Sequence, residues 1–120
     1  MTDLLLVHPG ATHGIYGSLG ETLVAVEPPL WCRIIASYFL DRGFTVRIID
    51  QEAERISAAE VADRVKEAAP RLTAICVFGH QPSASTQQMA GARAIADALW
   101  SRKIGPVMMM GNHPSALPER

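Results

Sequence analysis

The sequence predicts a single α/β domain in which a parallel sheet is covered by helices on both faces. Short, continuously apolar runs alternate along the chain with stretches of helical spacing, and an apolar run without a polar face is typical of a strand buried on both sides. The length of 120 residues suffices for one core and is too short for two domains of usual size. We expect the order βαβαβαβ, for which right-handed crossovers allow few topologies.

The first half of the chain contains two strands and one helix. The first strand is predicted over residues 4–7 and is followed by a long glycine-rich loop over 8–20. A helix should begin near Pro28–Pro29, since proline suits a first helical turn, and should end at Gly43. The next strand is predicted over 44–49.

A second helix is marked by the pair Ser57 and Glu60, whose spacing is that of a capping box. It should end by Pro70. The third strand is then predicted over 72–78.

A third helix should be capped by Ser85 or a neighbour, and the fourth strand should follow Gly105–Pro106 over residues 107–110. Three of its residues are Met108–Met110, which we expect to be buried rather than to form a sulfur site, because methionine packs readily in cores.

The composition is that of an ordinary globular protein. Hydrophobic residues make up 48% and charged residues 19%, and the net charge is -1, so no nucleic-acid partner is indicated. The first apolar run is too short for a signal sequence or a membrane span and follows Asp3, so we expect a cytoplasmic protein. Cys32 and Cys76 lie inside apolar runs, which indicates buried thiols rather than zinc ligands or a disulfide framework.

Three loops are the candidate binding region. In open parallel sheets, ligands bind beyond the carboxyl ends of the strands, near the point where the winding reverses. All four histidines of the chain fall in the loops at these ends, together with glycines and hydroxyl residues that permit close backbone approach and directional polar contacts. The loops are His8–Gly14, Gly79–Gln87 and Gly111–Ser115.

Common ligands of such sheets fit these loops poorly. Neither a Gly-x-Gly-x-x-Gly nor a P-loop sequence is present. The strand ends Val7–His8 and Phe78–Gly79 lack the acidic residues that a magnesium-binding receiver domain needs. A flavodoxin-type phosphate loop would be rich in hydroxyl residues, whereas the first loop offers only Thr12 and Ser18.

Four segments together resemble a known family. They are Glu27–Leu30, Asp41–Asp50, Pro82–Thr86 and His113–Glu119, and their order and spacing are similar to the amino-terminal cobalamin-binding domain of B12-dependent radical S-adenosylmethionine enzymes. The resemblance covers nearly the whole chain. It implies a doubly wound, flavodoxin-like parallel sheet of which four strands are visible and a fifth is missing.

The resemblance also implies a function. Cobalamin would be the cofactor, and the chain would present the corrinoid cobalt, base-off, to a radical S-adenosylmethionine catalytic domain in the same or another chain, for methyl transfer. In the family that domain carries an iron-sulfur cluster on a Cys-x-x-x-Cys-x-x-Cys motif, which this sequence lacks. We therefore expect no enzymatic activity from this chain by itself.

Carried over by position, the cofactor contacts fall in the three loops. Hydroxyl groups after the third strand would meet the nucleotide tail or the corrin amides, Gly111 would let the fourth strand pass close to the tail, and Pro9 with its neighbouring glycines would shape the rim. The complete predicted set is Pro9, Gly10, His13, Gly14, Gly79, His80, Ser83, Ser85, Thr86, Gly111, Asn112 and His113.

Two positions depart from family patterns. Cobalamin proteins with a protein imidazole on cobalt use Asp-x-His-x-x-Gly after the first strand, and here only His13 matches. Without the aspartate that orients the ring we expect no histidine on the lower cobalt face. Asn112 stands where a second glycine is common.

Other interpretations stay open. His8, His80 and His113 could serve a metal-dependent hydrolase, or the domain could bind another small molecule in a regulatory role. His8 and His80 could merely cap backbone carbonyls, and the hydroxyl residues could be turn or cap residues. Trp31 and Trp100 are expected in the core or on a helix face, with a ligand-facing or partner-facing role for Trp31 as the alternative.

The end of the chain carries a further expectation. A complete domain of this type continues past the fourth strand, so we expect a truncated domain whose fourth strand is an exposed edge. Such an edge favours pairing with another chain, here as a homo-oligomer.

Overall fold

The computed structural model describes residues 1–10, 29–78 and 82–116; the side chains of residues 82–87 and 113 lie outside this description. Four parallel strands form one sheet in the order β2-β1-β3-β4. The elements are β1 (Leu4–His8), α3 (Leu30–Leu40), β2 (Val46–Asp50), α4 (Gln51–Glu54), α5 (Ala58–Ala68), β3 (Leu72–Val77), α6 (Pro82–Ser101), β4 (Val107–Gly111) and α7 (Asn112–Ala116).

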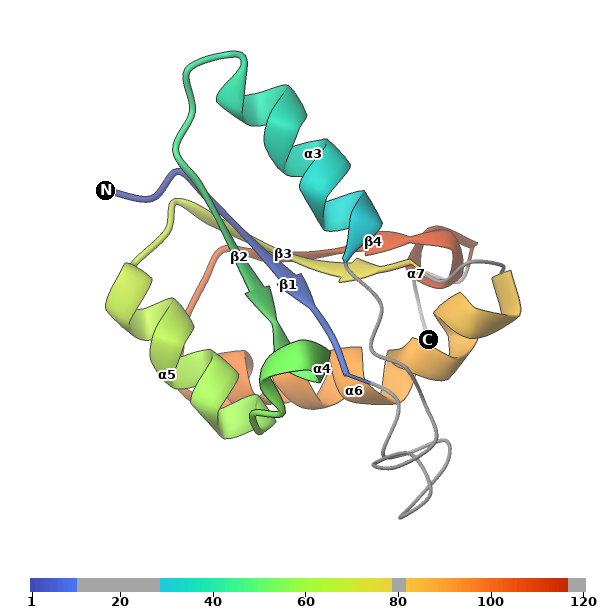
Figure 1. The fold of residues 1–120 in the computed structure, drawn as a ribbon. Helices are drawn as coiled ribbons and strands as arrows, with labels where there is room; N and C mark the ends of the chain where they lie inside the picture. Colours follow the sequence, from blue (N-terminus) through green and yellow to red (C-terminus); the bar gives the residue numbers. More distant parts are fainter. Residues whose placement is uncertain (11–28, 79–81, 117–120) are drawn as a thin grey trace.

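The sheet is doubly wound, as predicted. The chain passes from β1 to β2 at one edge and then returns to place β3 on the other side of β1, so the winding reverses between β1 and β3. Figure 1 shows α3 on one side of the sheet and α5 with α6 on the other. The carboxyl ends of β1 and β3 therefore lie next to each other at the reversal point.

Alternate residues of the central strands pack into two cores. Leu5 and Val7 of β1 face the cluster shared with α5 and α6, whereas Leu4 and Leu6 face the cluster shared with α3. All four side chains are buried. This double coverage explains why the first strand is a continuous apolar run.

The capping box at Ser57 and Glu60 is confirmed. The Ser57 hydroxyl accepts a hydrogen bond from the Glu60 amide at 3.1 Å, and the Glu60 carboxylate accepts one from the Ser57 amide at 2.7 Å. Two orphan amides of the first turn are thus satisfied within the sequence itself.

Several boundaries differ from the prediction; β2, for example, covers Val46–Asp50 where residues 44–49 were predicted. Helix α6 begins at Pro82, three residues before the predicted cap Ser85, because proline is well suited to the first helical position. The predicted loop Gly79–Gln87 is consequently helical from Pro82 onward. Similarly, α7 occupies Asn112–Ala116, most of the predicted third loop.

A short helix, α4, was not predicted. The Asp50 carboxylate accepts a hydrogen bond from the Ala53 amide at 3.1 Å, so the residue that ends β2 also caps α4.

The methionines of strand β4 are less buried than predicted. Within the described residues the strand pairs with β3 alone, and Val107 and Met108 are exposed. Met109 and Met110 are half-buried against opposite cores. The expectation of a fully buried methionine run is therefore wrong, because the strand lies at an edge of the described sheet.

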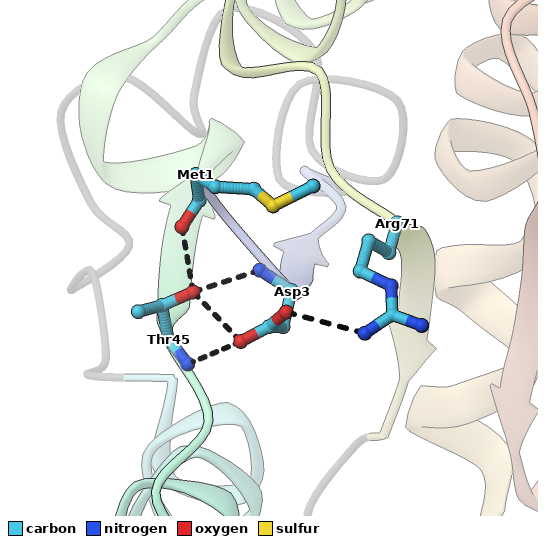
Figure 2. A network of polar contacts seen from close by, with 4 residues as sticks. All are labelled: Met1, Asp3, Thr45 and Arg71. Atoms are coloured by element: carbon cyan, nitrogen blue, oxygen red, sulfur yellow. Dashed lines mark hydrogen bonds and ion pairs between the residues drawn. The ribbon is translucent and has the colours of Figure 1, made fainter.

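A network of hydrogen bonds and one ion pair connects three chain segments at the amino edge of the sheet (Figure 2). The Asp3 carboxylate accepts a hydrogen bond from the Thr45 amide at 2.9 Å and lies 3.7 Å from the Arg71 guanidinium. The Thr45 hydroxyl in turn accepts from the Asp3 amide at 2.9 Å and lies 2.7 Å from the Met1 carbonyl. These contacts tie the start of β1 to the residues that precede β2 and β3.

The longest described helix, α6, carries Arg93 and Asp97, whose side chains lie 3.9 Å apart on one exposed face. None of the helices in the described ranges combines the length and apolarity needed to cross a membrane.

Candidate functional site

The carboxyl edge of the sheet holds every predicted site residue that the structure describes. Pro9 and Gly10 follow β1, Gly111 ends β4 and Asn112 begins α7. Four predicted residues lie outside the described residues: His13, Gly14, Gly79 and His80. For four others the side chains lie outside the description: His113, and Ser83, Ser85 and Thr86 in the first turns of α6.

Gly10 is held between two helices. Its amide donates a hydrogen bond of 2.8 Å to the Gln51 side-chain carbonyl on α4. On the other side, a Cβ atom at Gly91 of α6 would lie only 2.2 Å from the Gly10 carbonyl oxygen. The absence of a side chain at Gly91 is what allows α6 to approach the end of β1 so closely.

Sequence reasoning missed Gln51 and Gly91, although one signal existed. An isolated glycine inside a helical segment costs about 1 kcal/mol relative to alanine and often has a packing reason. Gly91 stands alone in the alanine-rich stretch of α6.

Gly111 has both the strain and the close contact that require glycine. Its φ is +135°, and a Cβ atom there would lie 2.0 Å from the Val77 carbonyl oxygen on β3. The β3 and β4 backbones therefore meet closely at the carboxyl edge, where the resemblance placed a close approach to the ligand.

His8 lies at the end of β1 in a polar cluster beneath the edge. Its Nε2 atom is 3.6 Å from Oε2 of Glu52, and its ring also hydrogen-bonds with Cys32. Burial alone lowers the pKa of His8, but the bonds with Cys32 and Glu52 and the charge of Asp50 outweigh burial and raise the pKa to about 9. His8 is thus an imidazolium at neutral pH, paired with side chains rather than capping a carbonyl.

The two cysteines are free, buried and hydrogen-bonded to each other. The bond from Cys76 is the largest influence on Cys32 and, together with the His8 imidazolium, lowers the pKa of Cys32 to about 6. The same bond raises the pKa of Cys76, which stays a thiol. The prediction of buried thiols is confirmed.

Gln88, in the second turn of α6, brings an unpaired acceptor. Its side-chain carbonyl oxygen is buried and has no hydrogen-bond donor within the described part of the chain. Leaving a buried acceptor unpaired costs about 1–3 kcal/mol, so such a group is a candidate for contact with a ligand. Gln88 lies three residues, about one helical turn, before Gly91, the residue of α6 that approaches Gly10.

An aromatic pair forms part of the same edge. The ring of Trp31, the second residue of α3, stacks on that of Phe78, the residue after β3, with centroids 5.3 Å apart and planes at 26°. Trp31 remains half exposed. Trp31 is therefore not a core residue, and one face of its ring is covered by Phe78.

Comparison with known protein families gave a match. A family model described as the B12 binding domain matches residues 18–120, which is most of the chain. No curated protein and no solved structure gave a match.

Proposed function

The chain belongs to the B12-binding domain family, and on that premise we propose that it is a cobalamin-binding module that presents the corrinoid cobalt to a radical S-adenosylmethionine catalytic domain. Cobalamin is the cofactor that membership implies. The family match over residues 18–120 is the observation that carries cobalamin binding, and the fold supports it. The proposed radical S-adenosylmethionine partner is supported by the resemblance of the four sequence segments.

The residues at the edge suit a corrinoid. A corrin ring bears carboxamide side chains, which donate and accept hydrogen bonds. The buried carbonyl oxygen of Gln88 lacks a donor among the described residues and would accept from one of these amides. Gly10 lies half-buried beside α4 after the end of β1, and Gly111 is buried against β3 at the end of β4.

The contact set follows from the same placement. We propose that Ser83, Ser85 and Thr86, in the first turns of α6, contact the nucleotide tail, and that Gly111 passes close to it. The rim would be completed by Pro9, Gly10, His13, Gly14, Gly79, His80, Asn112 and His113.

The cobalt would have no protein imidazole on its lower face. His13 lacks the aspartate two residues before it, where Ala11 stands, that would orient the ring. His8 is unsuitable for a different reason: an imidazolium whose nitrogens carry protons cannot donate a lone pair to a metal. The cofactor would then be bound base-off, with its nucleotide tail held by the protein.

When bound, cobalamin supplies cobalt-centred methyl-transfer chemistry, and the chain's own residues bind and orient it. The cluster chemistry of the proposed partner needs a cysteine motif that Cys32 and Cys76 do not form. The proposed partner domain, in the same or another chain, would therefore provide it.

Binding is tested with hydroxocobalamin. After gel filtration we expect the corrin absorption to elute with the protein, and the electron paramagnetic resonance spectrum of the reduced Co(II) complex to show no nitrogen splitting. Nitrogen splitting would contradict the base-off state, and absence of co-elution would overturn the proposal. Because presentation requires an open cobalt face, added cyanide should still shift the spectrum of the bound cofactor.

We also propose that the β4 edge pairs with a second copy of the chain. Its backbone is paired on one side only within the described residues, it exposes Val107 and Met108, and a net charge of -1 gives little repulsion between copies. Light scattering at high concentration should show a dimer, and V107K should shift it towards monomer. A wild-type monomer under these conditions would refute the dimer.

A further inference from the structure

We infer that the exposed face of Trp31 is the platform on which the corrin ring rests, an inference that depends on the proposed function. The rim of the edge then has an apolar contact as well as polar ones.

The geometry of Trp31 is that of a prepared surface. Phe78 covers one face of the indole at 5.3 Å and fixes its plane, while 49% of the residue stays exposed. Phe78 itself is half-buried against the core on the α3 side of the sheet. A large aromatic ring held rigid yet open to water loses little entropy on binding a second flat group.

The position of Trp31 matches the proposed site. Phe78 directly follows the last residue of β3, which places the stacked pair at the carboxyl edge. Cys32, the neighbour of Trp31 in the chain, hydrogen-bonds with His8 at the end of β1. Trp31 thus lies close to the reversal point between β1 and β3, where ligands of such sheets bind.

The corrin ring fits this surface better than the nucleotide tail does. A half-exposed indole at the rim offers a broad flat area, which suits a large macrocycle lying on the edge. The slender tail is instead proposed to lie along α6 and Gly111, which are parts of other elements.

The chain contains its own control. Trp100, the other tryptophan, is 85% exposed near the end of α6, just before the start of β4. Because α6 runs antiparallel to the strands, Trp100 lies at the amino edge, away from the proposed site.

The test compares the affinities of hydroxocobalamin and of dicyanocobinamide, which keeps the ring and lacks the nucleotide tail. W31A and W31L should each bind both corrinoids roughly tenfold more weakly, the size of one aromatic stacking contact. W31F should retain most of the affinity, and W100A should match the wild type. Visible circular dichroism of the bound ring should change in W31L and not in W100A.

Several outcomes decide the matter. W31L keeps the apolar bulk of the side chain, so it remains informative if W31A folds poorly, and thermal midpoints without ligand check folding. Wild-type affinity in W31L overturns the inference. So does a loss seen with hydroxocobalamin and not with cobinamide, since Trp31 would then meet the tail. If the wild type binds neither corrinoid, the proposed function fails and this inference fails with it.

Discussion

At the scale of single residues, the charge at the end of β1 is set by three side chains that belong to different elements. His8 ends β1, Glu52 lies on α4 and Cys32 lies in the first turn of α3. Folding brings the Glu52 carboxylate and the Cys32 side chain to the His8 imidazole, and each of these contacts favours the protonated form of His8. The result is a partly buried ion-paired cluster at the carboxyl end of β1.

The first prediction concerns the titration of His8. Its NMR titration midpoint should lie near pH 9, above the ordinary 6.5, and E52Q should lower it because the carboxylate is lost. E54Q, on the same helix but paired with Arg64, should leave it unchanged. A wild-type midpoint at or below 6.5 would contradict the cluster.

The two shifted pKa values in this cluster have opposite effects on the pH dependence of stability. The raised pKa of His8 stabilises the fold below about pH 6.5, and this stabilisation is lost as the pH rises through about 9. The lowered pKa of Cys32 has the opposite effect: it stabilises the fold above about pH 9, and this stabilisation is lost as the pH falls through about 6. Between pH 6.5 and 9 the folded pair therefore binds as many protons as the unfolded pair. The cluster should give no slope of unfolding free energy in this range.

The second prediction separates ligand contact from packing at Gln88. Q88L removes an unpaired buried acceptor, so the free energy of unfolding should stay equal or rise by up to about 1–3 kcal/mol. Hydroxocobalamin affinity should fall by about two- to tenfold, the worth of one hydrogen bond. Q51L is the comparison, because it breaks the bond to Gly10 and should destabilise the fold. A destabilised Q88L with unchanged affinity would make Gln88 a packing residue.

At the scale of elements, the sequence predicts strands and long helices well and their ends less well. The core strands are apolar because both faces are buried, and the capping box at Ser57 is a local signal. The start of α6 was missed because Pro82 competes with the serines as a starting residue. The short helix α4 was missed because a single turn capped by Asp50 has no apolar period.

The third prediction tests the close approach of β3 and β4. G111A should lower the free energy of unfolding by about 1–3 kcal/mol from backbone strain, and by more because of the contact with the Val77 carbonyl oxygen. Gly43 also has a positive φ, of 85°, but a Cβ atom there would meet nothing within 4 Å. G43A should therefore cost less than G111A in chemical denaturation. Equal costs would show that the strands relax apart readily.

At the scale of the whole molecule, the two ends of the sheet have different roles. A parallel sheet covered on both faces was predictable from the alternation of strands and helices, and the family resemblance implied that it is doubly wound. Both directed attention to the carboxyl edge. The contacts that shape this edge, such as Gly91 against Gly10 and Trp31 on Phe78, join residues far apart in the sequence. An isolated glycine in a helix can indicate close packing, but no local pattern identifies its partner, so only the structure could reveal these contacts. The fit of the loop residues themselves remains a prediction.

The fourth prediction concerns acid stability at the amino edge. Hydrogen bonds from the Thr45 amide and hydroxyl, and then the Arg71 guanidinium, lower the pKa of Asp3. A lowered pKa stabilises the fold above the unfolded value of 3.8 and loses that effect as the pH falls through the folded value. D3N should thus be less stable than the wild type at pH 7, and the difference should shrink below pH 4. D97N, which removes a carboxylate from an exposed helical pair, is the control to be measured at the same pH values.

The network at the amino edge also has a practical consequence. The Met1 carbonyl lies 2.7 Å from the Thr45 hydroxyl, so the chain terminus is held on the side of the sheet opposite to the proposed cofactor, while Met1 itself is almost fully exposed. A biotin or a fused reporter attached at Met1 would leave the carboxyl edge facing the solution. Immobilised protein could then be exposed to corrinoids, or to candidate partner domains, with the binding edge unobstructed.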